Sequence, residues 1–322
     1  MIFIGDAFST LRGMLPKTFH CVVTSPPYYG LRDYGVAGQI GLEPEPRLYV
    51  ERLVEIFREV RRVLRDDGTL WLNLGDSYFG SGKGAASAPE NAAHYKQGTN
   101  KGMVGAASTL IAPTGPAKNL MGIPWRVAFA LQEDGWNLRQ DIIWAKPNPM
   151  PESVTDRCTK SHEYIFLFSK SPRYYFDADA IREPAQETTV KRCSQSGSTR
   201  PLPRYGGKKY TAYPEQFFRT KSGTAYDIRD GRRNKRDVWT VATVPCKEAH
   251  FATFPPELIR PCIRAGAPID GIVLDPFFGS GTTGVVCTQE NRNYIGIELN
   301  RDYVQIAKRR IEAVERTGML MI

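Results

Sequence analysis

Residues 273–283, V-L-D-P-F-F-G-S-G-T-T, decide the fold, because they join a β-strand to a helix through a glycine-rich turn. The apolar run 271–274 predicts the strand, and residues 282–290 predict the helix. A second strand is predicted at 294–297, directly before Glu298. This succession indicates a strand–helix–strand unit with parallel strands.

The same alternation continues through the rest of the chain. Leu53, Phe57, Val60 and Leu64 recur at helical spacing and place an apolar stripe on a helix over 47–65. The other predicted strands are 2–4, 20–24, 69–74, 141–144 and 163–169, and the other predicted helices are 9–15, 123–132 and 301–316. The sequence therefore predicts an α/β fold, a mostly parallel sheet with helices on both faces.

Composition excludes several classes of protein. Of 322 residues, 41% are hydrophobic and 24% are charged, which is typical of a folded globular chain. The apolar runs are too short for a membrane span, and the N-terminus lacks the pattern of a signal peptide. Six scattered cysteines without a C-x-x-C pair, and four isolated histidines, argue against a zinc site or disulfide framework. We therefore expect a cytoplasmic protein that binds no metal and no membrane.

Positive charge is concentrated in one segment. Residues 181–237 carry 14 basic and 6 acidic residues, so they hold +8 of the net charge of +9. Such an insert is typical of a segment that binds a polyanion, although a solvated loop with incidental charge is the alternative. The candidate DNA-binding residues are Lys191, Arg192, Arg200, Arg204, Lys208, Lys209, Arg219, Lys221, Arg232, Arg233, Lys235 and Arg236. Residues 77–118 are rich in Gly, Ala, Ser and Asn, and predict a flexible flap.

The glycine-rich turn has the chemistry of a nucleoside site. Its glycines let the backbone approach a ligand, and Glu298, 17 positions after Gly281, could bind ribose hydroxyls. A dinucleotide fingerprint would require G-x-G-x-x-G, which is absent, whereas Asp275 and Phe277 suit a cationic nucleoside without phosphate. S-adenosylmethionine has that character. A tight turn without a ligand is the alternative.

A second unusual turn follows the strand 20–24. Ser25, Pro26, Pro27 and Tyr28 end the strand rigidly, because proline fixes φ and cannot donate to a ladder. The adjacent carbonyl groups stay free to accept hydrogen bonds from a substrate amino group, with help from the Ser25 hydroxyl. Tyr28 could then stack on a planar ring. A plain Pro-Pro turn that ends a strand is the alternative.

Together, T-S-P-P-Y at 24–28 and D-P-F-F-G-S-G-T-T at 275–283 resemble the motifs of bacterial and phage DNA amino-methyltransferases. The order of the motifs resembles the circularly permuted β group, which implies a Rossmann-like, S-adenosylmethionine-dependent fold. The implied divisions are a catalytic half at 1–180, a target-recognition insert at 181–237 and a cofactor-binding half at 238–322. Double-stranded DNA is the implied partner. The resemblance also allows a homodimer, for which the sequence indicates no interface.

The resemblance assigns roles to individual residues. Ser25, Pro26, Pro27 and Tyr28 would orient the target amino group of a base flipped out of the duplex. The implied cofactor-binding residues are Asp6, Thr24, Phe254, Asp275, Phe277, Gly279, Ser280, Gly281, Thr282, Glu298 and Asn300. Those of the target-base pocket are Tyr29, Trp144, Lys146, Pro147 and His162.

The target base stays open at this stage. Family members with serine before Pro-Pro more often resemble cytosine N4 enzymes, and those with aspartate or asparagine resemble adenine N6 enzymes, so Ser25 favours cytosine. RNA or protein-glutamine methylation is a further alternative, but those enzymes resemble the unpermuted order. A non-catalytic nucleic-acid-binding protein is the last alternative. The recognition sequence does not follow from the insert, because it depends on which side chains reach the groove.

Overall fold

The computed structural model describes residues 1–31, 34–79, 115–188, 190, 217–219, 225–227, 231–244 and 254–319. It divides into two compact units, of which the first comprises Met1–Phe176 and Asp237–Ile322 and the second Asp177–Arg236.

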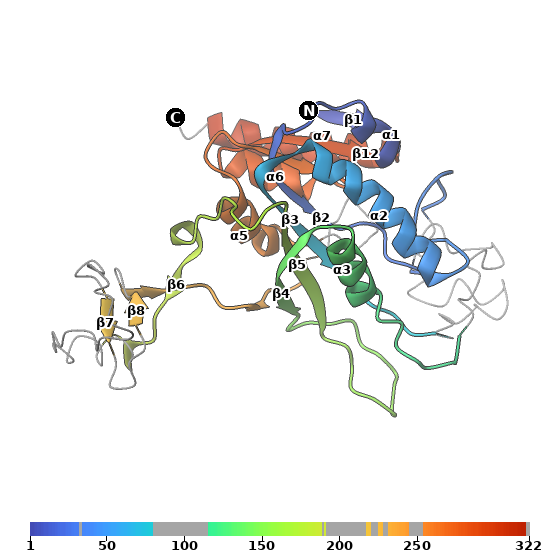
Figure 1. Cartoon of the computed structure of the whole chain (residues 1–322), viewed down its shortest axis with the longest axis horizontal. Coiled ribbons are helices and arrows are strands. Elements are labelled where there is room, and N and C mark those ends of the chain that lie inside the picture. The colour runs from blue at the N-terminus through green and yellow to red at the C-terminus, as the bar shows by residue number, and fades with distance from the viewer. Residues whose placement is uncertain are drawn as a thin grey trace, which may run out of the picture. The chain divides into compact units, whose positions relative to one another are not determined.

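An eight-stranded sheet forms the centre of the first unit (Figure 1). Its order is β1-β12-β11-β2-β3-β5-β4-β10, and β5 is antiparallel to both of its neighbours. The strands are β1 (Ile2–Ile4), β2 (Phe19–Thr24), β3 (Leu64–Leu74), β4 (Asn137–Ala145), β5 (His162–Ser169), β10 (Val238–Thr240), β11 (Ile272–Asp275) and β12 (Asn293–Glu298). The predicted class, a mostly parallel sheet with helices, is confirmed.

Two central strands come from opposite ends of the chain. β2 and β11 pair in parallel, with Val273 beside Cys21 and Leu274 beside Val22. From β11 the chain moves to β12 on one side, and from β2 it moves to β3 on the other. Ligands of open α/β sheets bind where the strand order diverges in this way, beyond the carboxyl ends of the strands. The permuted chain therefore places its two unusual turns side by side.

Six helices of the first unit form two layers. Contacts join α1 (Ala7–Arg12), α2 (Pro46–Val63) and α3 (Ile123–Glu133) into one group. They join α5 (Pro256–Gly266), α6 (Thr282–Gln289) and α7 (Arg301–Met319) into another. Strand alternation explains the division, because Val22 and Leu70 belong to the core beneath α2 whereas Cys21 and Trp71 surround Gly266 of α5.

The second unit contains two small antiparallel pairs of strands in its described residues. β6 (Glu183–Pro184) pairs with β9 (Arg232–Arg233), and β7 (Phe217–Arg219) pairs with β8 (Ala225–Asp227). A short 3₁₀-helix, Asp179–Ile181, precedes β6. This unit lies where the sequence predicts the insert at 181–237, and its role in target recognition stays a prediction.

Two differences from the predicted elements have clear causes. α5 was not predicted, because Pro256 and Pro261 lie within it. Pro256 occupies the first turn, where a missing N–H is harmless, and Leu258, Ile259 and Cys262 bury the apolar face that compensates for Pro261. In addition, β3 begins at Leu64 rather than Thr69, through a bulge opposite His20. Most of the predicted flap, 80–114, lies outside the described residues, and among those described no helix could span a membrane.

Candidate active site

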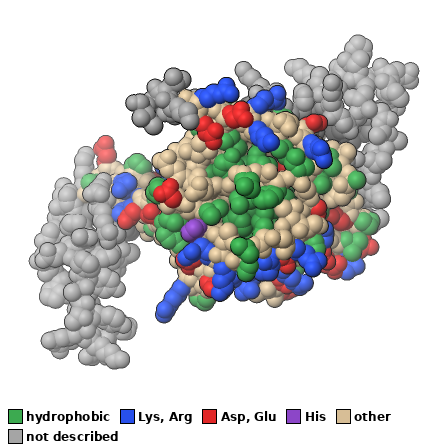
Figure 2. Space-filling view, turned by 90° about the horizontal axis from the view of Figure 1, so that it is seen from above, with side chains coloured by type: hydrophobic (Ala, Val, Ile, Leu, Met, Phe, Trp, Pro, Cys, Tyr) green, Lys and Arg blue, Asp and Glu red, His purple; other side chains and the backbone are tan. Residues whose placement is uncertain are grey.

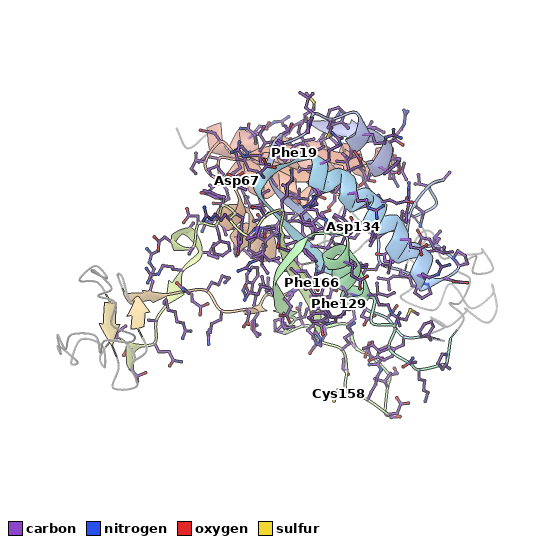
Figure 3. All side chains as sticks on the ribbon, in the orientation of Figure 1. Phe19, Asp67, Phe129, Asp134, Cys158 and Phe166 are labelled. Atoms are coloured by element: carbon purple, nitrogen blue, oxygen red, sulfur yellow. The ribbon has the colours of Figure 1, made fainter. Side chains whose placement is uncertain are left out.

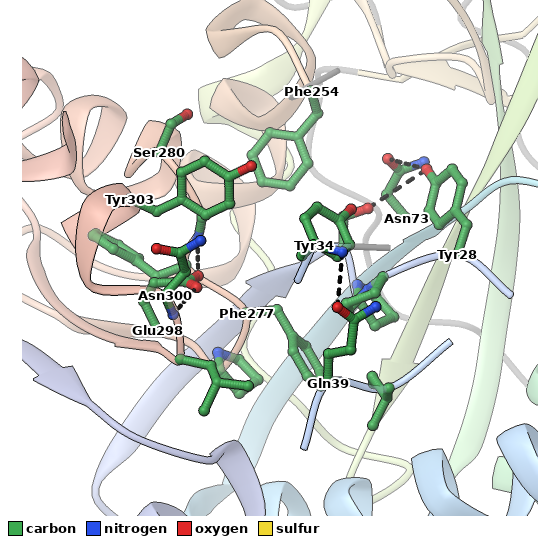
Figure 4. A pocket seen from close by; sticks show the side chains of 18 of the residues that line it. Tyr28, Tyr34, Gln39, Asn73, Phe254, Phe277, Ser280, Glu298, Asn300 and Tyr303 are labelled. Carbon is green, nitrogen blue, oxygen red and sulfur yellow. Dashed lines mark hydrogen bonds between the residues drawn. The ribbon is translucent and has the colours of Figure 1, made fainter. Parts of the chain in front are cut away.

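A cavity of about 570 Å³ lies at the carboxyl ends of β2, β11 and β12 (Figure 4). It is lined by residues of both unusual turns, including Ser25 and Tyr28 from the first and Phe277 and Gly279 from the second. The other predicted site residues that line it are Asp6, Pro26, Pro27, Trp144, Lys146, Phe254, Ser280, Thr282, Glu298 and Asn300. The fold thus brings the two turns, about 250 positions apart in sequence, to one cavity.

Asp275 holds the glycine-rich turn together from behind the cavity. Its Oδ1 accepts hydrogen bonds from Thr24 Oγ1 at 2.6 Å and from the Phe277 amide at 3.0 Å, and its Oδ2 accepts from Thr283 Oγ1 at 2.6 Å. The side chain is buried, and burial raises the pKa of this carboxyl to about 6, although its hydrogen bonds oppose the shift. Asp275 and Thr24 therefore do not line the cavity, and their hydrogen bonds stabilise the turn that does.

The glycines of this turn are required by its packing. Gly281 adopts φ +80°, and a Cβ atom there would lie 2.6 Å from the Cβ of Ala307 in α7. From the same helix, Arg310 donates to Ser280 through the backbone carbonyl at 2.6 Å and the hydroxyl at 2.7 Å. Arg310 thereby connects the turn to α7 and stabilises it. The sequence analysis missed it, since an arginine in an amphipathic helix carries no distinguishing pattern.

Glu298 joins the turn to the end of β12. Its two carboxylate oxygens accept from the Gly279 amide and the Asn300 amide, both at 2.7 Å. Burial raises the pKa of this carboxyl, while the two amides oppose that shift. Figure 4 shows Glu298 and Asn300 on one side of the cavity, with Tyr303 and Phe254 nearby. The carboxylate keeps unused acceptor capacity toward the cavity, because each oxygen can accept two hydrogen bonds.

The two carbonyl groups of the Pro-Pro turn differ in their hydrogen bonds. The Pro27 carbonyl accepts from Tyr49 Oη at 2.8 Å, whereas nothing among the described residues donates to the Pro26 carbonyl. Tyr29 was predicted in the target-base pocket, but the structure places it elsewhere. It is 2% exposed, packs against Tyr49 with ring centroids 5.5 Å apart, and does not line the cavity.

A polar cluster, comprising Tyr28, Asn73, Lys146 and Glu163, also lines the cavity, and Figure 4 shows Tyr28 and Asn73 on the opposite side from Glu298. Tyr28 Oη donates to Glu163 Oε2 at 2.7 Å and lies 3.2 Å from Asn73 Oδ1. Lys146 Nζ pairs with Glu163 Oε1 and lies 4.2 Å from the centre of the Trp144 ring. Burial, followed by the charge of Glu163, raises the pKa of the Tyr28 phenol well above its ordinary value. The phenol therefore stays protonated at neutral pH.

Some predicted residues lie away from the cavity and some cavity residues were not predicted. Besides Tyr29, Asp275 and Thr24, the predicted residues that do not line it are Gly281, Pro147 and His162. Lining residues that were missed include Tyr34, Gln39, Asn73, Glu163 and Tyr303. Glu163 could have been predicted, because it directly follows His162, which was assigned to the target-base pocket. Asn73 carries no such signal, since it lies within an apolar strand.

The predicted DNA-binding residues are only partly described. Lys191, Arg192, Arg200, Arg204, Lys208, Lys209 and Lys221 lie outside the described residues, and Arg219 is described only as backbone in β7. Within the second unit, Arg233 and Arg236 both donate to Glu183 Oε1, at 2.9 and 2.8 Å. Part of the basic charge is therefore balanced locally.

In the space-filling view, basic side chains gather along one edge of the first unit, with some acidic side chains among them (Figure 2). Arg58 and Asp134, for example, pair at 2.6 Å between α2 and α3, where Figure 3 labels Asp134. In the part of the chain that the structure describes, no three His, Cys, Asp or Glu side chains gather as metal ligands would.

Comparison with known proteins gives consistent similarities. The DNA methylase family model matches residues 19–309. The chain is 48% identical over 315 residues to the Type II methyltransferase M.XycI of Xanthomonas campestris pv. cyanopsidis, covering 97% of this chain and 87% of the relative. It is also 48% identical over 325 residues to the Type II methyltransferase M.Cfr9I of Citrobacter freundii, covering 100% of this chain and 90% of the relative.

Solved structures share the fold. The PvuII DNA methyltransferase, described as cytosine-N4-specific, is similar with a TM-score of 0.62 at 18% identity, covering 98% of this chain and 89% of that one. A putative DNA modification methylase from Thermus thermophilus, complexed with S-adenosyl-L-methionine, is similar with a TM-score of 0.56 at 21% identity, covering 97% of this chain and 93% of that one.

Proposed function

Because the chain belongs to the family of N6/N4 DNA methylases, we propose that it methylates the N4 amino group of cytosine in duplex DNA, with S-adenosylmethionine as methyl donor. The observation that carries this proposal is the single cavity shared by the glycine-rich turn and the Ser-Pro-Pro-Tyr turn. One turn has the chemistry to hold a nucleoside, and the other has acceptors for an amino group. Transfer between the two ligands requires both in one enclosure.

The residues of the cofactor side fit S-adenosylmethionine. Glu298 offers acceptor oxygens for ribose hydroxyls, and the Phe254 and Phe277 side chains provide apolar walls for adenine and the sulfonium region. Gly279 allows close approach of the backbone, with φ +52° and only a Phe277 carbonyl oxygen, at 3.9 Å, near its missing Cβ. When bound, S-adenosylmethionine supplies an electrophilic methyl group, which forms a bond to nitrogen as its bond to sulfur breaks and leaves the electron pair on sulfur.

The catalytic side overcomes the weak nucleophilicity of an aryl amine. The Ser25 hydroxyl and the Pro26 carbonyl accept from the amino hydrogens, which draws the nitrogen toward an sp³ geometry and directs its lone pair at the methyl carbon. Among the described residues nothing donates to the Pro26 carbonyl, which supports this role, whereas Tyr49 already donates to the neighbouring Pro27 carbonyl. Positioning and stabilisation of the transient positive charge then provide the rate acceleration.

The substrate base leaves the duplex to reach this cavity. Its amino group is otherwise engaged in a base pair, so we propose flipping, with the Tyr28 ring available for stacking. The basic second unit is proposed to hold the duplex, with Arg232 and Lys235 among its cations. Cytosine rather than adenine is proposed because Ser25, a short neutral residue, precedes Pro-Pro.

Transfer of labelled methyl from S-adenosylmethionine to unmethylated genomic DNA, followed by nucleoside analysis, tests the proposal. N4-methylcytosine is the expected product. N6-methyladenine would keep the reaction class and contradict the role of Ser25 in choosing the base. Measurable cofactor binding without any methylated nucleoside would contradict the DNA substrate, and RNA and protein would be tested next.

A further inference from the structure

We propose that Tyr28 and Glu163 form a proton relay that removes, through Ser25, the proton released by the methylated amino group. The relay ends at the Glu163 carboxylate, which Lys146 keeps paired. This inference rests on the proposed function, because the released proton exists only if an amine is methylated. It assigns Tyr28 a role in addition to stacking and Glu163 a role that the sequence motifs do not suggest.

A chain of hydrogen bonds connects Ser25 in the cavity to the Glu163 carboxylate. Ser25 Oγ donates to Tyr28 Oη at 3.5 Å, and Tyr28 Oη donates to Glu163 Oε2 at 2.7 Å. Glu163 Oε2 is the nearer of two acceptors for the Tyr28 hydroxyl, since Asn73 Oδ1 lies at 3.2 Å, so the shortest path leads to Glu163. The Tyr28 ring packs closely against Gly75, where a Cβ atom would lie 2.5 Å from the ring. Because Gly75 has no side chain, the ring can take the position that the relay requires.

Glu163 suits the last position because its two oxygens have different partners. Oε1 pairs with Lys146 Nζ, and Oε2 receives both Tyr28 Oη and, at 3.3 Å, Asn73 Nδ2. Its side chain is 15% exposed, which leaves a route for the proton to solvent. Tyr28 acts as a neutral hydroxyl that accepts one proton as it gives up another, because ionisation of the buried phenol beside Glu163 is unfavourable.

The protons and charges balance along this path. Formation of the nitrogen–carbon bond makes the amino nitrogen cationic, and one of its N–H bonds then breaks. That proton moves to Ser25 Oγ, the hydroxyl proton of Ser25 moves to Tyr28 Oη, and the phenol proton moves to Glu163 Oε2. The product amine and Glu163 are both neutral, and Glu163 returns its proton to water after product release.

The first test is the pH dependence of single-turnover methyl transfer to duplex DNA. Glu163→Gln keeps the shape of the side chain and removes the proton acceptor, so the rate should fall by about 100-fold. The rate of wild type should also fall at acidic pH, and the variant should lack this acid limb. Lys146, Lys160 and Tyr28 are the titratable groups that face Glu163, and none of them changes in the variant. Glu163→Asp should restore the limb, and the exposed Glu51→Gln is the matched control.

A second test requires no methyl donor. The protein is prepared with isotope-labelled glutamate, and infrared spectra are recorded without ligand. Subtraction of the Glu163→Gln spectrum from the wild-type spectrum isolates the band of the Glu163 carboxylate. Tyr28→Phe should shift this band, because it removes the 2.7 Å hydrogen bond. In methyl transfer, Tyr28→Phe and Glu163→Gln should not be additive, since both interrupt one path.

Three results would overturn the relay. They are an acid limb that persists in Glu163→Gln, a carboxylate band that Tyr28→Phe leaves in place, and losses of rate that multiply in the double variant. Each of these can be observed in a protein that methylates DNA, so it contradicts the relay alone. A wild-type protein that transfers no methyl to DNA would contradict the proposed function as well.

Discussion

The turn that follows β11 is stabilised mostly by its own neighbourhood, whereas the turn that follows β2 depends on distant strands. Asp275 accepts from residues two and eight positions further along the chain, and Glu298 accepts from Gly279, 19 positions before it. One hydrogen bond to Asp275 is distant in sequence, from Thr24 at the end of β2. Tyr28, in contrast, donates to Glu163, which is 135 positions away. Both turns line one cavity. The hydrogen bonds of the first turn are therefore mostly local, whereas the second turn is assembled by tertiary structure.

The largest expected effect lies in the local turn, at Gly281. Gly281→Ala should lower the free energy of unfolding by about 4 kcal/mol, since it combines an unfavourable left-handed conformation with a clash against buried Ala307. Gly122 is a matched control, because it also begins a helix with positive φ, 69° against 80°, but has nothing within 4 Å of its missing Cβ. Gly122→Ala should cost only about 1 kcal/mol. Equal losses in urea unfolding would show that packing against α7 does not matter.

These two turns also differ in how far the sequence predicts them. The glycine spacing, Asp275 and Glu298 lie within 24 positions, so their pattern is visible in one stretch of sequence. The prolines after β2 are equally visible, but the polar cluster around Tyr28 is not. Asn73 lies in β3 and Glu163 in β5, and Lys146, the partner of Glu163, directly follows β4. The direction of Tyr29 also depends on the position of Tyr49 in α2. Strands and helices with regular apolar spacing were predicted well, whereas α5, interrupted by Pro261, was not.

Asp275 should make stability depend on pH. Its pKa in the folded protein is about 6, above the ordinary value of 3.8, so the folded state favours the protonated carboxyl. Its contribution is therefore fully present below pH 4 and is lost as the pH rises through about 6, with a total of about 3 kcal/mol. Asp275→Asn should remove this dependence, so the difference in unfolding free energy between wild type and variant should change between pH 4 and pH 7.

The exposed Asp302→Asn is the control for that measurement, and it should leave the pH dependence of wild type intact. If the difference between wild type and Asp275→Asn stayed constant across the range, the hydrogen bonds from Thr24, Thr283 and Phe277 would be strong enough to cancel the effect of burial. The ionised Asp275 carboxylate would then cost the folded state no free energy.

The smallest effect concerns the assembled turn, through the ion pair of Lys146 and Glu163. A double-mutant cycle with Lys146→Met and Glu163→Gln should give a coupling free energy of about 2 kcal/mol, because both side chains are largely buried, at 17% and 15% exposure. Lys17 and Asp66 form the surface pair for comparison, at 2.7 Å with 63% and 62% exposure, and should couple much more weakly, because solvent screens both charges. Urea unfolding of both sets measures the difference. If the two pairs gave equal coupling free energies, the charges of Lys146 and Glu163 would be screened as strongly as charges on the surface. Burial of this pair would then add no stability to the turn after β2.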